Sequence, residues 1–171
     1  MKTQIIKAVF ALMLIIPTGL IAQTKSKIGH VNSNDLLLLM PERKTAETDL
    51  QTFAKSLEDQ LSSMTSEYEK KLTEYQTNAQ VMAAPVRESK EEELGSLEQR
   101  IRDFQVKAQQ SIQTKEQELM QPMLEKANTA IEAVAKENEY SYILDTSAGV
   151  VLYFPEADDI LPLVKTKLGI Q

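Results

Sequence analysis

The 171-residue sequence predicts a mostly helical α+β protein, in which a small β-containing body carries a long antiparallel helical hairpin. Three observations lead to this prediction. An apolar stripe is mirrored about Ala84 and Pro85, the stretch from Glu42 to Met82 contains neither Gly nor Pro, and β-prone segments lie near the two ends of the chain. The hairpin would therefore be an arm inserted between two parts of one body.

The apolar stripe ascends from Leu50 to Met82 and descends from Val86 to Leu119, and the residue numbers of mirror partners add to 168 or 169. Two antiparallel helices that touch along one face need this symmetry, because both advance about 1.5 Å per residue. One long helix that pairs in parallel with another chain is the alternative, but the break at 83–85 favours a hairpin. The partners are Tyr75 with Leu94, Leu72 with Leu97, Tyr68 with Ile101, Met64 with Phe104, Leu61 with Ala108, Leu57 with Ile112, and Leu50 with Leu119.

The coiled-coil arm is expected to span residues 42–118, with its tip at 83–86. Pro41 fits the first turn of the first helix, and Pro122 should kink the second helix because it removes one backbone hydrogen bond. The two prolines lie at a similar level of the hairpin, so we expect them to form the joint between arm and body. Gly95 is a third candidate hinge residue, although a Gly that the helix merely tolerates is the simpler interpretation.

The first part of the body is expected to cover residues 23–41. Lys27–Val31 is β-prone, and Ser33, Asn34 and Asp35 offer N-cap side chains to a short helix over residues 36–40. That helix contains four consecutive Leu residues, so we expect it to be buried on all sides.

The second part of the body is expected to cover residues 119–171. Tyr140–Leu144 and Val150–Phe154 should be strands joined by a turn, and a last amphipathic helix should follow Asp158 and Asp159. Together with the N-terminal β-prone segment, these strands would form one small sheet.

The body is too small to bury a large core, because more than half of the mature chain is committed to the arm. The sequence also lacks Cys, so disulfides cannot compensate. We therefore expect the body to associate with further copies of itself. The candidate oligomerisation residues are Ile28, Val31, Tyr142, Leu144, Val151 and Tyr153.

Residues 1–22 resemble a secretory signal peptide. Lys2 and Lys7 precede an uninterrupted apolar run from Ala8 to Ile16, and Pro17 follows it. A retained membrane anchor and a buried helix are the alternatives, but the apolar run is short for a membrane span. We therefore expect export across the inner membrane with cleavage of the signal.

The sequence offers little catalytic chemistry. It contains one His, His30, and no Cys, so a catalytic triad or a transition-metal site lacks its usual groups. Its Gly residues are isolated, which excludes a phosphate-binding loop, and Glu91–Glu93 is best interpreted as a solvated face. We therefore predict that the chain is not an enzyme and has no cofactor or metal.

The net charge of the chain restricts the kinds of partner that it can bind. Without the signal segment the chain has 17 basic and 25 acidic residues, which argues against nucleic acid. Apolar residues of the arm that lie off the stripe, or at its tip, are instead candidates for weak contacts with an unfolded protein. These candidate client-binding residues are Phe53, Val81, Met82, Val86, Val106 and Met120.

Several blocks at the two ends of the chain resemble the Skp/OmpH family of periplasmic chaperones, while the coiled-coil middle is generic. The blocks are Lys27–Asn32, Met40-Pro41-Glu42, Leu119–Pro122, Ala130–Glu137, Tyr142–Asp145, Leu152-Tyr153 and Asp159-Ile160.

The resemblance implies a jellyfish-like homotrimer, in which three arms enclose a cavity that holds unfolded outer-membrane proteins without ATP. The chain departs from the basic enterobacterial members of this family, because residues 42–118 carry 11 basic and 16 acidic side chains. We therefore transfer no lipid-binding residues, and peripheral contact with a membrane stays open. A non-catalytic spacer or adaptor of the cell envelope, which binds one folded partner, is the alternative function.

Overall fold

The structure is a computed structural model that describes residues 26–170. The predicted signal peptide therefore lies outside the described residues. The described elements follow the order β1 (Ile28–Val31), α2 (Ser33–Leu39), α3 (Glu42–Asn78), α4 (Ala84–Glu137), β2 (Tyr142–Asp145), the 3₁₀ helix η1 (Glu156–Asp158) and α5 (Leu161–Leu168).

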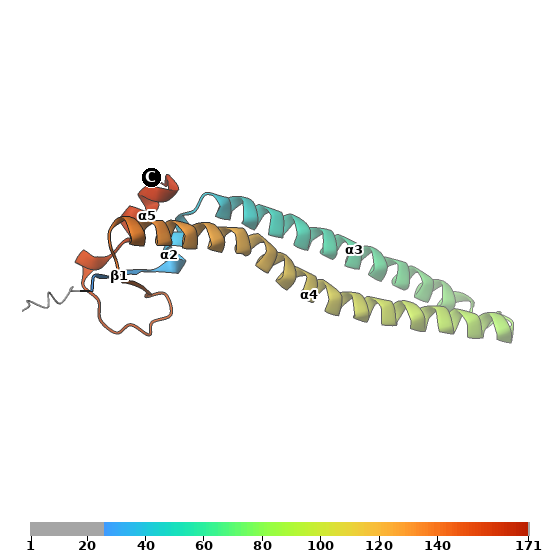
Figure 1. The fold of residues 1–171 in the computed structure, drawn as a ribbon. Coiled ribbons are helices and arrows are strands. Elements are labelled where there is room, and N and C mark those ends of the chain that lie inside the picture. The colour runs from blue at the N-terminus through green and yellow to red at the C-terminus, as the bar shows by residue number, and fades with distance from the viewer. Residues whose placement is uncertain (1–25, 171) are drawn as a thin grey trace, which may run out of the picture.

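The predicted arm is present as an antiparallel pair formed by α3 and the first part of α4 (Figure 1). The first helix ends at Asn78 rather than near Met82. The Ala79 N–H still donates to the Tyr75 carbonyl, but the Val81 N–H donates to the Asn78 carbonyl three residues earlier, which closes a tighter turn. Pro85 lies in the first turn of α4, where its missing N–H costs no helical hydrogen bond. The α+β hairpin architecture predicted from the sequence is thus confirmed.

Polar contacts between the two helices agree with the antiparallel register. Glu42 at the start of α3 forms an ion pair with Lys126 of α4. Near the tip, Lys71 Nζ lies 2.5 Å from Glu93 Oε1. The stripe itself is narrow: α3 has no fully buried residue, and the buried arm residues of α4 are Leu94 and Leu97.

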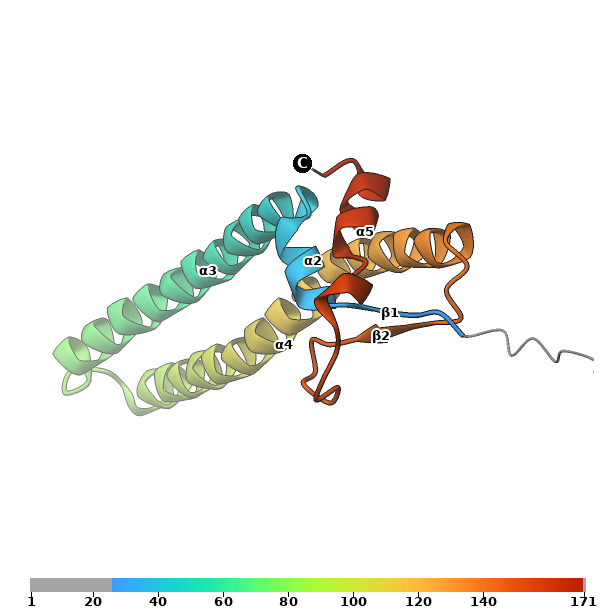
Figure 2. The ribbon, with the colours of Figure 1, turned by 90° about the vertical axis from the view of Figure 1, so that its left-hand side faces the viewer.

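Strands β1 and β2 form a parallel pair in which Ile28 lies opposite Tyr142 and Val31 opposite Asp145. A parallel pair requires a crossover connection, and here the crossover contains α2 and the entire arm. Figure 2 shows the two strands side by side beneath α4. Segments near the two ends of the described chain therefore pair with each other in the body.

The predicted strand at Val150–Phe154 is not present. This segment belongs to a loop between β2 and η1 that extends from the body (Figures 1 and 2). β2 occupies one edge of β1 and the His30–Asp159 bridge occupies the other, so the chain after β2 crosses to the far edge of β1 and this segment does not pair with the outer edge of β2.

Two details of α2 differ from the sequence prediction. Its N-cap is Asn32, whose side chain accepts hydrogen bonds from the backbone N–H groups of Asn34 and Asp35. The helix is also not buried on all sides: Leu36 and Leu37 are buried, whereas Leu38 and Leu39 are 55% and 44% exposed. Four consecutive residues span most of the circumference of a helix, and only one side of α2 packs against the body.

The core lies where α2, α4 and α5 meet β1. Gly29 is needed at the centre of β1, because a Cβ atom there would lie 2.9 Å from both Ile160 Cγ2 and Tyr140 Cε1. Pro122 lies inside α4 without ending it, and Figure 1 shows that α4 changes direction between the body and the arm. The buried cluster consists of Val31, Leu36, Leu37, Met40, Met123, Ala127, Ala130, Val134, Ile160 and Val164.

Candidate functional site: surfaces of the arm and the body

The candidate client-binding residues do not form one patch. Val81, Met82 and Val86 lie at or beside the turn of the hairpin, and Val81 is 84% exposed there. Val106 is exposed farther down α4, while Phe53 is half-buried. The structure thus provides separate apolar contacts along the arm rather than one binding pocket made by these side chains.

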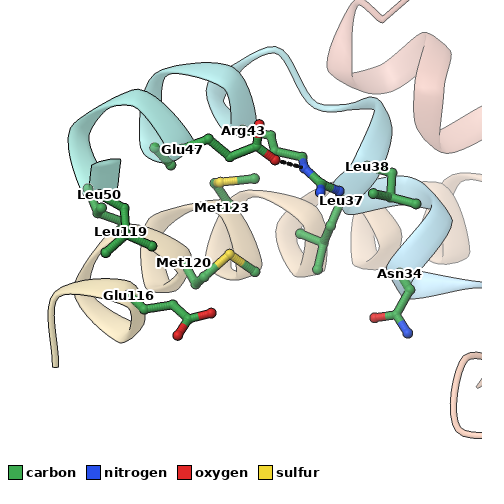
Figure 3. A pocket seen from close by; sticks show the side chains of 11 residues that line it. Asn34, Leu37, Leu38, Arg43, Glu47, Leu50, Glu116, Leu119, Met120 and Met123 are labelled. Carbon is green, nitrogen blue, oxygen red and sulfur yellow. Dashed lines mark hydrogen bonds and ion pairs between the residues drawn. The ribbon is translucent and has the colours of Figure 1, made fainter. Parts of the chain in front are cut away.

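Met120 lies at the other end of the arm and packs against the buried core of the body. It also lines an apolar groove of about 350 Å³ at the root of the arm (Figure 3). This groove lies between α2, α3 and α4 and was not predicted, because its walls come from three separate parts of the sequence. Its lining residues are Asn34, Leu37, Leu38, Arg43, Ala46, Glu47, Leu50, Glu116, Leu119, Met120 and Met123.

The charged groups of the groove are not all paired. Arg43 Nε donates a hydrogen bond to Glu47 Oε1 at 2.5 Å, so these two charges offset each other. Among the described residues, Glu116 has no ion-pair partner and the Asn34 side-chain amide has no hydrogen bond. Figure 3 shows Glu116 and Asn34 at opposite ends of the groove, on α4 and α2.

The candidate oligomerisation residues are mostly exposed within the single chain. Ile28, Tyr142, Leu144 and Tyr153 present apolar surface, and Tyr153 is 84% exposed. Val31, by contrast, is 2% exposed and belongs to the core of its own body, and Val151 is half-buried. The sequence prediction missed the neighbouring Leu152, which is 96% exposed.

His30 has a structural role at the base of this loop. Its Nε2 atom lies 2.9 Å from the Pro155 carbonyl oxygen, and its ring packs against that of Phe154 with 4.4 Å between the centroids. Because a carbonyl oxygen only accepts hydrogen bonds, Nε2 carries the proton in this contact. His30 thus fixes the end of the loop, whereas Val150, Leu152 and Tyr153 are exposed.

Asp145 links the end of β2 to the start of α2. Its carboxylate accepts a hydrogen bond of 2.6 Å from the Ser33 hydroxyl and others from the backbone N–H groups of Ser33 and Ser147. Partial burial by itself would raise the pKa of Asp145, but these hydrogen bonds outweigh burial and the pKa lies below its ordinary value.

The candidate hinge residues have different surroundings. Pro41 directly precedes α3, and the adjacent Glu42 has a lowered pKa, mainly because of its hydrogen bond from Lys126. Gly95 lies inside α4, where an added Cβ atom would meet nothing within 4 Å. The packing of the helices therefore does not require Gly at position 95.

The described part of the chain contains no group of three or more His, Cys, Asp or Glu side chains arranged to hold a metal ion. Within residues 26–170, none of the helices has the length and apolar character of a membrane span.

These features define the class of protein to which the chain belongs: a small mixed body that carries one long helical hairpin. The model of the OmpH family, described as "Outer membrane protein (OmpH-like)", matches residues 27–168, and the chain belongs to this family. The resemblance inferred from the sequence is therefore confirmed. Membership in a family of chaperones also supports the prediction that the chain is not an enzyme.

Two relatives are named "Chaperone protein Skp". The protein from Pectobacterium atrosepticum is 27% identical over 150 residues, which cover 86% of this chain and 88% of the relative. The protein from Vibrio cholerae is 25% identical over 130 residues, which cover 74% of this chain and 75% of the relative. A crystal structure from Caulobacter crescentus CB15, described as a candidate OmpH-like outer membrane chaperone, has the same fold, with a TM-score of 0.72. The two sequences are 18% identical, and the match covers 84% of this chain and 83% of the Caulobacter chain.

Proposed function

We propose that this chain is an ATP-independent chaperone of the periplasm that holds unfolded outer-membrane proteins and prevents their aggregation. The observation that carries the proposal is the long arm, whose helix α3 has no fully buried residue along its length. Such an arm offers a large accessible surface and no enclosed reaction site. The relatives named as chaperones support this function, and the signal-like residues 1–22 support export.

Holding without ATP follows from mass action. A partner that binds only the unfolded client lowers the concentration of the free, aggregation-prone client in proportion to its own concentration and affinity. Separate apolar contacts, such as Val81, Val86 and Val106, would each bind weakly and accept many client sequences. Release follows when folding of the client at the outer membrane is more favourable than binding to the arm.

Self-association through the body is part of the proposal, with a homotrimer as the expected assembly. In the described chain, none of the backbone N–H groups of residues 150–154 donates a hydrogen bond. The outer edge of β2 is also unpaired in the described chain, and an exposed strand edge favours pairing with another chain. A second copy would supply hydrogen-bond partners to both the loop and this edge if its own loop or strand pairs there.

The function is tested by diluting a urea-unfolded outer-membrane barrel protein into buffer and following aggregation by light scattering. We expect the mature protein to suppress aggregation, and the triple variant Val81→Ser, Val86→Ser, Val106→Ser to require several-fold more protein for the same protection. Substitution of exposed polar residues elsewhere on the arm, Thr73→Ser on α3 and Gln99→Ser on α4, is the control. Met120 is left unchanged because it also packs against the core.

An adaptor would behave differently in this experiment. It would leave aggregation unchanged and would bind one folded envelope protein while ignoring denatured ones. That result would contradict the chaperone function and favour the alternative.

The assembly is tested with the double variant Leu152→Ser, Tyr153→Ser. Both side chains are exposed in the single chain, so their replacement should leave its own core intact. We expect analytical ultracentrifugation to show a loss of the oligomer at micromolar concentration. An unchanged mass would exclude the loop from the interface.

A further inference from the structure

We propose that the apolar groove at the root of the arm anchors an extended client segment in which apolar side chains alternate with polar ones and at least one polar residue is basic. This inference rests on the proposed function and adds to it a place of contact and the chemistry of the bound segment. It concerns residues that lie apart from the exposed tip of the arm.

The shape and lining of the groove fit an apolar side chain. Met120 and Met123 lie between Leu50 and Leu119 at one end and Leu38 at the other (Figure 3). A volume of about 350 Å³ is at the lower end of the range for ligand sites in proteins. Met side chains adapt to different apolar shapes, which suits a site that must accept many client sequences.

The polar groups of the groove favour a basic segment. Arg43 is offset by Glu47, whereas Glu116 has no ion-pair partner among the described residues, so the groove has a net negative charge. The whole arm adds to this field, with 16 acidic and 11 basic side chains over residues 42–118. The Asn34 amide can both donate to and accept from the backbone of an extended chain.

A client segment fits the groove better than a second copy of this chain. The exposed apolar residues of the body, Tyr142, Leu152 and Tyr153 among them, do not line the groove, so the proposed assembly surface is separate from it. A second copy would also bring a net negative charge to a negative groove. Strands of outer-membrane barrels alternate apolar and polar residues, which matches the proposed segment.

Fluorescence can test occupancy of the groove directly, because the chain contains no Trp. The variant Leu38→Trp places a probe in the groove, and Leu39→Trp is the matched control: the neighbouring residue on α2 has similar exposure but does not line the groove. The ligand is a Trp-free peptide of about nine residues that alternates Leu with Ser and carries one central Lys. A second peptide has Glu in place of Lys.

We expect the Lys peptide to shift the emission of the Leu38→Trp variant to shorter wavelength in a saturable way and to leave the Leu39→Trp variant unchanged. The Glu peptide should bind about threefold more weakly, and Glu116→Gln should remove that preference. Equal shifts in both Trp variants, or no shift in either, would overturn the proposal.

The aggregation assay separates failure of this inference from failure of the proposed function. We expect Leu38→Gln to require several-fold more protein for half protection of an unfolded barrel protein and Leu39→Gln to match the unsubstituted protein. If the unsubstituted protein protects and Leu38→Gln protects equally well, the groove is not an anchor but the chaperone function stands. If the unsubstituted protein does not protect, both proposals fall. A change in the mass of the Leu38→Gln assembly would show that the groove is covered by another copy, which also overturns the inference.

Discussion

The arm and the body of this protein reach stability in different ways. The body concentrates its fully buried residues in one cluster where α2, α4 and α5 meet β1. The arm has only a half-buried stripe along α3, and the two buried residues of the arm, Leu94 and Leu97, lie on α4 toward the tip. The difference indicates that the body is fixed by packing, whereas the arm leaves most of its surface exposed to solvent.

The largest expected difference between the two regions concerns loss of apolar volume. Leu36→Ala in the fully buried core should lower the free energy of unfolding by about 2 to 5 kcal/mol, because it removes burial and leaves a cavity. Leu61→Ala in the half-buried stripe should cost about 1 kcal/mol. Urea unfolding at one fixed protein concentration measures both, and equal losses would contradict the distinction between body and arm.

Gly29 and Gly95 lie inside described elements, and their replacement by Ala should change the stability of the protein in opposite directions. Gly29→Ala places a Cβ atom within 3.0 Å of three side chains and should destabilise the body by about 1 to 3 kcal/mol. Gly95→Ala meets no atom within 4 Å and should stabilise the helix by about 1 kcal/mol. Thermal unfolding of each variant measures whether its stability falls or rises relative to the unsubstituted protein. If Gly95→Ala also weakened client protection, Gly95 would act as a hinge and not as a tolerated residue.

Acid should weaken the body through Asp145. The pKa of the Asp145 carboxyl is lower in the folded state than in the unfolded state. The ionised carboxylate therefore stabilises the folded protein fully above the unfolded pKa of about 3.9, and this stabilisation is lost as the pH falls through the folded pKa. Asp145→Asn should cost about 1 kcal/mol at pH 7, and the difference from the unsubstituted protein should shrink toward pH 3. Thermal unfolding between pH 7 and pH 3 measures this, and a difference that does not depend on pH would contradict a role for the carboxylate charge.

The arm could be predicted from the sequence because helical periodicity and the mirrored register are local patterns that repeat over many residues. The body could be predicted only in part. Val150–Phe154 has the composition of a strand, but β propensity depends on context, and the chain leads this segment from β2 to the far edge of β1, where Phe154 and Pro155 contact His30. Likewise, the run of Leu residues did not reveal that Leu38 and Leu39 face outward.

The groove at the arm root shows why the candidate site was the hardest part to predict. The sequence pattern predicts Met120 as an isolated contact on the arm. Met123 lies one helical turn away and Leu38 about eighty residues earlier, and only the packing of α2 against α4 brings the three together. The spacing of Met120 and Met123 on one helical face is the signal that could have indicated a shared surface.

The mass of the purified mature protein, alone and after mixing with an unfolded outer-membrane barrel protein, tests the central claim most directly. Native mass spectrometry should show an oligomer, expected to be a trimer, and a complex of that oligomer with one client chain. A monomer that forms no client complex would contradict both the assembly through the body and the chaperone function of the arm.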